Sequence, residues 1–311
     1  MLVFALALFC YWPALHGVQL WDDPAHIPQP EMRTWEGLGR MWTEANATQQ
    51  YYPVLFSAFW IEHRIWGDSM LGYHLFNAAL HALCGCLLAA VVRRLWALPS
   101  GGSPRPGGAP ADTRIGEWAA WLAALLFTAH PVGVESVAWV TEQKNTLSLV
   151  FGLLAAWAYL GFEADRRPRT YALATVLFVA ALGSKITTAT LPAILLVLLW
   201  WRNGTLRWRR DVLPLVPWFA LSFGVGLLVN WIEHVYIGAT GKDYVLTLGQ
   251  RVLLSGRIVW FFLAKAIWPP DYAFFYRRWD VAVESAGWFL HLGAAVATMI
   301  LLWAVRRKTR G

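Results

Sequence analysis

Two adjacent carboxylates, Asp22 and Asp23, follow the first apolar segment of the chain, and His26 comes three residues later. Neighbouring carboxylates hinder each other's ionisation, so such a pair can bind a divalent cation or accept a proton from a hydroxyl group. A solvated loop that caps a helix is the structural alternative, because such carboxylates mark functional sites only in some proteins. The pair therefore indicates catalysis, with Mg or Mn as the candidate cofactor, or a capping loop.

A second polar run lies between two apolar segments and contains His130, Glu135 and Lys144. Ionisable groups at this depth face a cavity or the outer water rather than lipid. Lys144 and His130 can hold a phosphate, and Glu135 can orient one of them. Helix capping and a buried hydrogen-bond network are the alternative. The run is therefore a second candidate site.

Three cations, Arg251, Arg257 and Lys265, lie on an otherwise apolar segment. Each costs on the order of 2.5–3.5 kcal/mol at mid-membrane depth on insertion scales. Anionic lipid head groups or a lipid phosphate would offset that cost. Long side chains that reach back to the interface are the alternative. We expect the segment 251–268 to be interfacial or re-entrant, because a further span would place the basic C-terminal residues outside.

The elements that must position these residues are apolar helices. The chain has 311 residues, of which 58% are hydrophobic and 14% charged, and a protein of this length in water needs more charge. Since a spanning helix needs roughly 20 apolar residues, we predict an all-α fold, a polytopic membrane helix bundle of about eight or nine transmembrane or re-entrant helices. The candidate segments are 2–20, 71–92, 117–131, 145–162, 170–184, 186–201, 212–231, 251–268 and 285–305.

The net charge of +7 comes from short arginine clusters between the apolar segments, such as Arg166, Arg167 and Arg169. This distribution is typical of cytoplasmic loops and excludes a nucleic-acid partner. The segments 21–70, 131–145, 232–250 and 269–284 then face outward, and they carry most of the carboxylates. We expect a multi-pass integral membrane protein, in the inner membrane of a bacterium, with its chemistry on the outer face.

Some segments are not expected to span. Residues 51–66 combine aromatic side chains with adjacent charges, which indicates a half-buried interfacial helix, and residues 31–45 have the spacing of an amphipathic helix. Residues 93–116 include a Gly/Pro/Ser-rich stretch and are predicted to form a flexible cytoplasmic linker. His74, Asn77 and His81 share a helix face, where a polar interhelical network is favoured over a haem site.

The order of several motifs resembles the transmembrane, tetratricopeptide-repeat-containing O-mannosyltransferases and their bacterial relatives, within the GT-C glycosyltransferases. The resemblance implies that a polyprenyl-phosphate carrier supplies a sugar to an acceptor on the outer side. It also implies that Asp22 and Asp23 form the acidic motif, while Lys144, Arg251 and Arg257 bind the lipid phosphate. The motifs are Trp21-Asp22-Asp23, Tyr52-Pro53, Trp66-Gly67, Tyr73 to Asn77, His81-Ala82, His130-Pro131, Glu135 to Trp139, Lys144-Asn145, Lys185, Thr190 to Pro192, Arg251, and Trp268 to Tyr272.

We therefore predict a membrane glycosyltransferase that moves a sugar, with mannose as the candidate, to an acceptor hydroxyl on a protein or glycan. His26, His130, Glu135 and Lys185 are expected to support the site. The family's C-terminal repeats are absent from residues 1–311, which we expect to form a single transmembrane domain. The alternatives are a transporter or lipid flippase, with a helix break at Gly183 to Lys185, and a non-catalytic membrane scaffold.

Overall fold

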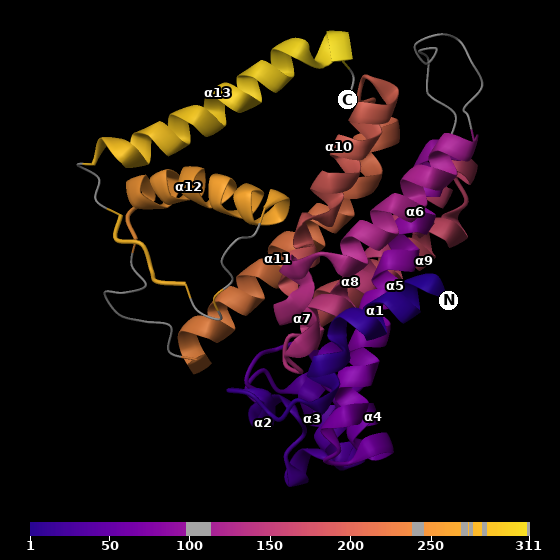
Figure 1. Cartoon of the computed structure of the whole chain (residues 1–311), viewed down its shortest axis with the longest axis vertical. Coiled ribbons are helices and arrows are strands. Elements are labelled where there is room, and N and C mark those ends of the chain that lie inside the picture. Colours follow the sequence, from indigo (N-terminus) through magenta and orange to yellow (C-terminus); the bar gives the residue numbers. More distant parts are fainter. Residues whose placement is uncertain (98–112, 238–245, 269–272, 274–275, 282–284, 310–311) are drawn as a thin grey trace. The chain divides into compact units, whose positions relative to one another are not determined.

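The computed structural model describes residues 1–97, 113–237, 246–268, 273, 276–281 and 285–309 (Figure 1). These residues form helices and turns, with no β-strand among them. The contacts within the chain define two compact units, Met1–Ile237 and Gly238–Gly311, and each is described here by itself. The assignment of residues 1–311 to one domain stays a prediction.

Five helices of the described residues are long and apolar enough to cross a membrane. They are α5 (Met70–Ala97), α8 (Gln143–Asp165), η4 with α10 (Ile186–Asn203), the continuous helix around α11 (Trp208–Tyr236) and most of α13 (Ala286–Val305). A bent pair, Arg114–Ala129 and Pro131–Ala138, would make a sixth span. The apolar helices α1 (Leu2–Tyr11, continued by η1, Trp12–His16) and α9 (Pro168–Ser184) are shorter. The chain is thus an all-α, polytopic membrane protein, as predicted.

The bend of 51° in this pair separates α6 (Thr113–Ala129) from η3 (Pro131–Gly133) and α7 (Val134–Ala138). Pro131 supplies no backbone N–H, and a residue before proline disfavours the helical conformation, so α6 ends at this point. The Nδ1 atom of His130 then accepts a hydrogen bond from the backbone N–H of Val132 at 3.2 Å. This turn directs the chain towards the start of α8.

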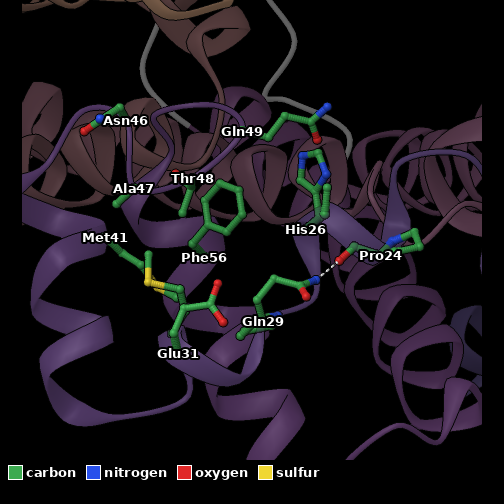
Figure 2. A pocket seen from close by; sticks show the side chains of 13 residues that line it. Pro24, His26, Gln29, Glu31, Met41, Asn46, Ala47, Thr48, Gln49 and Phe56 are labelled. Carbon is green, nitrogen blue, oxygen red and sulfur yellow. Dashed lines mark hydrogen bonds between the residues drawn. The ribbon is translucent and has the colours of Figure 1, made fainter.

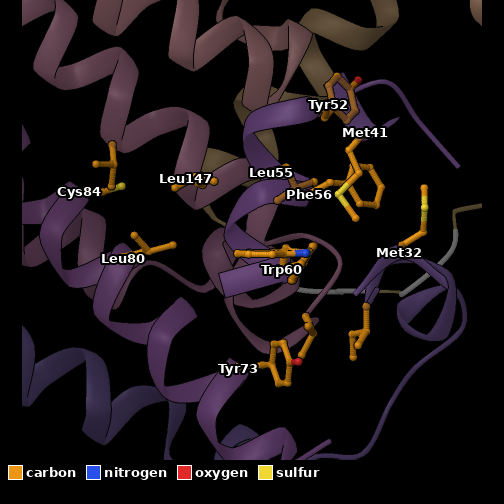
Figure 3. Close-up of a cluster of buried hydrophobic side chains, with 14 residues drawn as sticks. Met32, Met41, Tyr52, Leu55, Phe56, Trp60, Tyr73, Leu80, Cys84 and Leu147 are labelled. Carbon is orange, nitrogen blue, oxygen red and sulfur yellow. The ribbon is translucent and has the colours of Figure 1, made fainter. Parts of the chain in front are cut away.

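The segment 21–70 contains α2 (Asp23–His26), η2 (Pro30–Met32), α3 (Trp35–Thr43) and α4 (Pro53–Trp66). Both helices predicted for its interfacial stretches are therefore present. One face of α4 packs into a core with α5 and α8, where Leu55 and Phe56 are buried (Figure 3). Ile61 and Ile65 on the other face are exposed. Such a half-buried helix is what an interfacial position requires.

The predicted interhelical network on α5 is confirmed. The amide of Asn77 donates to the carbonyl oxygens of Ser136 and Val137, and its oxygen accepts a bond from Thr146. The His81 ring nitrogen Nε2 lies 3.1 Å from the Thr128 carbonyl oxygen. These bonds connect α5 to α6, α7 and α8, so the polar side chains hold this part of the bundle together.

The predicted linker 93–116 is wrong at its edges. Residues up to Ala97 continue α5, and Thr113–Gly116 begin α6, because apolar and helix-forming residues extend the periodic pattern on both sides. The Nε atom of Arg93 donates to both Glu117 carboxylate oxygens at 2.9 Å, which ties the two helices together. The Gly/Pro-rich centre of the linker lies outside the described residues.

In the second unit, α12 (Leu248–Ile267) begins at a capping box formed by Thr247 and Gln250 and packs against α13 (Ala286–Thr309). The indole N–H of Trp260 donates to the carbonyl oxygen of His291 at 3.0 Å. Unlike α13, α12 is not among the helices apolar enough to span. Its interfacial or re-entrant position stays a prediction.

Candidate functional site

The second residue of the acidic pair, Asp23, is fully buried and holds the turn at residues 20–23 in place. Its Oδ1 atom accepts bonds from the backbone N–H and the hydroxyl of Thr141, at 2.8 and 2.6 Å. Its Oδ2 atom accepts a bond from the Leu20 N–H at 2.7 Å. Trp21, which lies between Leu20 and Asp23, has φ of 42°, a left-handed conformation that bulky residues rarely adopt. Asp23 therefore fastens this turn to the residues that start α8.

The first residue of the pair, Asp22, has a free oxygen. Its Oδ1 atom is buried and has no hydrogen-bond partner among the described residues, while Oδ2 lies 3.7 Å from His26 Nδ1. A buried carboxylate oxygen without a donor costs free energy unless a ligand or water supplies one. Because Asp23 holds the turn, Asp22 is kept in place without using its Oδ1 atom.

His26 stands beside Asp22 and is almost fully buried. Its Nδ1 atom lies 3.1 Å from the Asp22 carbonyl oxygen, and its ring stacks on Phe56 at 5.4 Å between centroids. Burial lowers the pKa of His26, so the ring is neutral at pH 7. A carbonyl oxygen can only accept a bond, so Nδ1 carries the hydrogen and Nε2 keeps a lone pair. The Nε2 atom has no partner among the described residues.

A charged cluster occupies the start of α8. The Glu142 carboxylate lies 2.9 Å from the Lys144 ammonium and 3.3 Å from that of Lys185, which comes from the break between α9 and α10. Asn145 joins them, donating to Glu142 at 2.6 Å and accepting from Lys185 at 2.5 Å. Two ammonium groups share the one carboxylate that contacts them in this largely buried position, while the charge of the exposed Glu135 acts on them from α7.

Burial alone would raise the pKa of Glu142, but the charges of Lys144 and Lys185 outweigh it and lower that pKa. Glu142 is therefore ionised near neutral pH. Burial lowers the pKa of Lys185, although Glu142 opposes this effect. A buried cation is costly unless an anion is near. The cluster is therefore a favourable place for an anionic group of a ligand.

Lys144 joins this cluster through Glu142, whereas two other predicted residues of the first unit, Glu135 and His130, do not contact it. Glu135 is exposed on α7, although its charge acts on the lysines. His130 uses Nδ1 to cap η3. Sequence reasoning thus missed Glu142 as the partner of the lysines and Thr141 as the partner of Asp23. The sequence signal that could have identified Glu142 was its position two residues before Lys144 at a predicted helix start. No sequence signal indicated Thr141.

The second unit contains the other predicted cations. The Arg257 guanidinium lies 4.5 Å from the Trp279 ring and 4.9 Å from the Trp288 ring. These three residues, with Arg277 and Arg278, line a pocket of about 420 Å³. The Lys265 ammonium lies 5.2 Å from the Tyr276 ring, and Arg251 donates to the Leu246 carbonyl oxygen. Aromatic rings and guanidinium groups together suit a phosphate attached to an apolar chain.

The acidic pair fits a divalent cation poorly. Both oxygens of Asp23 already accept bonds from protein donors. Across the described residues, no group of three His, Cys, Asp or Glu side chains is arranged to hold a metal ion. Hard cations such as Mg²⁺ need several free oxygen ligands, and here only Asp22 offers one. The Mg or Mn predicted from the sequence stays a prediction.

The chain is similar to several animal protein O-mannosyl-transferases. It is 24% identical to protein O-mannosyl-transferase F38B6.6 of Caenorhabditis elegans over 167 residues, which is 50% of this chain and 22% of that protein. Identity to TMTC3 of Mus musculus is 25% over 168 residues, 51% of this chain and 16% of TMTC3. Identity to Tmtc1 of Drosophila melanogaster is 28% over 196 residues, 60% of this chain and 21% of Tmtc1.

The match covers about a fifth of the length of each of these relatives. No family model matches the chain, and no solved structure matches it. The motif-based resemblance to the O-mannosyltransferases is thereby confirmed as a distant relationship.

Proposed function

We propose that this chain, a distant relative of the protein O-mannosyl-transferases, is a membrane glycosyltransferase that moves a sugar from a polyprenyl-phosphate donor to an acceptor hydroxyl. The observation that carries the proposal is the unpartnered Oδ1 atom of Asp22, buried on a turn that Asp23 fastens to the lysine-containing start of α8. Mannose is the proposed sugar, and the acceptor is a protein or a glycan on the outer face.

Asp22 and Asp23 have different roles in the acidic motif. Asp22 accepts the proton of the acceptor hydroxyl while the oxygen of that hydroxyl bonds to the anomeric carbon of the sugar. The bond from that carbon to the phosphate oxygen breaks, and the lipid phosphate leaves with the electron pair. Asp23, whose oxygens accept bonds from Leu20 and Thr141, positions Asp22 without touching the substrate.

The leaving phosphate gains negative charge, which basic groups stabilise. Lys144 and Lys185 supply that charge from the start of α8, since Glu142 neutralises only one of them. Arg251, Arg257 and Lys265 of the second unit are proposed to bind the head group or phosphate of the lipid carrier. The outer face and the inner membrane of a bacterium stay predictions for this multi-pass protein.

The test is sugar transfer by the full chain in nanodiscs, with radiolabelled polyprenyl-phosphate mannose as donor and serine- or threonine-containing peptides or mannosides as acceptors. Asp22→Asn should lower transfer at least about a hundredfold, because it removes a general base. Its melting temperature should stay unchanged, since the Asp22 side chain makes only one long contact within the part of the chain that the structure describes.

Glu36→Gln serves as the matched control, because Glu36 is an exposed carboxylate on α3 of the same outer segment. It should transfer sugar at the parent rate. Undiminished transfer by Asp22→Asn would remove this residue from the mechanism. Absence of any transfer by the parent would refute the proposed function.

A further inference from the structure

Three consecutive residues at the start of α8 each bond to a different part of the first unit. Thr141 donates to the acidic motif, and Glu142 pairs with both lysines. Gln143, the first residue of α8, donates from its side-chain amide to the Oε1 atom of Glu62 at 2.5 Å. Glu62 lies on α4, so this bond connects α8 to the outer segment. The proposed mechanism does not yet use it.

The pair formed by Glu62 and Gln143 lacks a hydrogen atom when Glu62 is charged. The two residues are only 3% and 0% exposed. The Oε2 atom of Glu62 and the Oε1 atom of Gln143 are buried and have no hydrogen-bond partner among the described residues. A carboxylate can only accept bonds, so neither oxygen would have a donor. A proton on Oε2 supplies that donor, and a neutral carboxyl group can then form two hydrogen bonds with the amide, one in each direction.

The surroundings of Glu62 also favour the neutral acid. Burial raises its pKa to about 8, although the bond from Gln143 opposes the shift, and no charged group among the described residues contributes to it. His63, the next residue of α4, faces Asp68 at 3.8 Å. The nearby titratable groups on the helices packed against α4 have other partners. They are Arg40 of α3 with Glu44, Tyr73 of α5 with the Gly67 carbonyl oxygen, Lys144 of α8 with Glu142, and Lys185 after α9 with Glu142 and Asn145.

The helix that carries Glu62 also contacts the residues beside the proposed base. Phe56, on the same helix, lies in the wall of a pocket of about 540 Å³ and stacks on His26, another of its lining residues (Figure 2). His26 in turn contacts Asp22. A displacement of α4 relative to α8 would therefore change both the start of α8 and the surroundings of the acidic motif.

We propose that Glu62 is a neutral acid in the folded protein, and that its two hydrogen bonds with Gln143 position the start of α8 for the donor phosphate. When Glu62 gives its proton to water, the bond from Oε2 is lost and a buried negative charge faces an acceptor oxygen, so the pair opens. Rising pH then loosens the contact between α4 and the lysine-containing start of α8. Glu62 is a positioning residue, since it acts through Gln143. The consequence for the donor rests on the proposed glycosyl transfer, whereas the proton can be measured without it.

The first experiment detects the proton by infrared difference spectroscopy of the parent minus Glu62→Gln. At about pH 6 the difference should contain the carbonyl stretching band of a neutral carboxyl group, because an ordinary glutamate is already ionised there. The band should disappear as the pH rises through about 8. Glu36 is an exposed carboxylate on α3, so the parent minus Glu36→Gln should show no such band. Absence of the band from the Glu62 difference would overturn the proposal.

A second measurement tests the pairing itself. Gln143→Met removes the amide but keeps a side chain of similar length. The carboxyl band of Glu62 should then move to higher frequency, because a carbonyl group that loses a hydrogen bond has a stiffer C=O bond. An unchanged frequency would show that Glu62 is paired with water or another group instead of Gln143.

The effect on the site is measured as the binding of polyprenyl monophosphate to the full chain in nanodiscs, between about pH 7 and 9. Burial also lowers the pKa of Lys185, so the informative quantity is the difference between the parent and Glu62→Gln. The glutamine cannot lose a proton, and its amide can still form two bonds with Gln143. The Kd of the parent should therefore rise more than that of the variant, by up to about tenfold one pH unit above the pKa of Glu62.

Glu163→Gln is the matched control, because Glu163 is a buried carboxylate at the other end of α8. It should keep the pH profile of the parent. Glu62→Met removes both hydrogen bonds and should weaken phosphate binding at each pH, and Glu62→Gln should recover most of that loss. Identical pH profiles for the parent and Glu62→Gln would overturn the positioning role, even if the methionine variant fails to fold.

The two proposals fail in different ways. A proton on Glu62 and pH-dependent phosphate binding, without sugar transfer by the parent, would refute the proposed function alone. Sugar transfer by the parent, with no neutral carboxyl band from Glu62, would refute this inference alone.

Discussion

The two ends of α8 both bury carboxylates beside cations, yet they differ in where the positive charge lies. At the start of the helix, Lys144 and Lys185 are mostly buried around Glu142. At its end, Glu163 pairs with Arg166 at 2.6 Å, and this arginine is one-third exposed. Arg166 also donates to the Arg210 carbonyl oxygen at 2.9 Å.

The difference in exposure of the cations indicates a binding site at the start of α8 and a purely structural ion pair at its end. Water and salt screen the charge of an exposed arginine, whereas a buried ammonium keeps its full attraction for an anion. The pair at the end of α8 connects this helix to the residues before α11. At its start, two buried ammonium groups contact one carboxylate, and Asp23 fastens the turn that carries Asp22 to the same end, so the candidate site lies there.

The largest expected effect comes from removing the carboxylate that the two lysines share. Glu142→Gln leaves two nearly buried ammonium groups without the anion that contacts them, so it should lower the free energy of unfolding by about 3–5 kcal/mol. Sugar transfer should also be lost. Thermal unfolding in detergent and the transfer assay measure the two effects.

Glu163→Gln is the matched substitution at the other end. Arg166 can turn to water, so we expect a smaller loss of about 1–2 kcal/mol and unchanged affinity for the donor. An equal loss of sugar transfer in Glu142→Gln and Glu163→Gln would show that the two ends of α8 do not differ in function.

The next effect is a pH dependence that belongs to the start of α8. Burial raises the pKa of Glu62 to about 8, although the hydrogen bond from Gln143 opposes this shift. An unfolded glutamate ionises near pH 4.5, so between about pH 4.5 and 8 the unfolded state holds fewer protons than the folded one. The contribution of Glu62 to stability should therefore fall as pH rises through this window, by up to about 1.4 kcal/mol per pH unit.

Glu62→Gln should remove that slope, since glutamine has no proton to lose. The measurement is the melting temperature of the parent and the variant at several pH values between 5 and about 8. Equal slopes in the parent and in Glu62→Gln would show that Glu62 is ionised in the folded protein, contrary to its burial.

The smallest effect concerns the donor. Lys185→Met removes one of the two ammonium groups but keeps the apolar stem, and it leaves Glu142 paired with Lys144. We expect the KM for polyprenyl-phosphate mannose to rise about fivefold, which corresponds to about 1 kcal/mol. Arg166→Met at the other end should leave this KM unchanged, and a comparable rise there would show that the charge acts only at long range.

Local signals were sufficient for most of the helices. The apolar stretches 71–92 and 145–162 lie within the observed helices α5 and α8, because a run of apolar residues without proline has few alternatives to a helix in lipid. The linker was placed too widely because the residues on both sides of its glycines continue the neighbouring helices. Asp22, Asp23, His26 and Lys185 were also candidates from the sequence, and the structure arranges them around the start of α8.

The partners of these residues could not be obtained from the sequence. Asp23 accepts a hydrogen bond from Thr141, which is 118 positions away. Lys185, at the break between α9 and α10, forms an ion pair with Glu142. Glu135 and Glu142 both precede or follow apolar helices and both carry the right charge for Lys144. Only the packing of α7 and α8 exposes Glu135 and buries Glu142.

The sequence by itself determined that the chain is a helical membrane protein related to O-mannosyltransferases, because hydropathy, arginine distribution and motif order are properties of the chain alone. The tertiary structure alone decided that both carboxylate oxygens of Asp23 accept hydrogen bonds while Oδ1 of Asp22 has no partner among the described residues. It also decided that two lysines pair with Glu142. Each of these outcomes depends on which donor or charge lies within a few ångströms, and that is set by how distant segments pack.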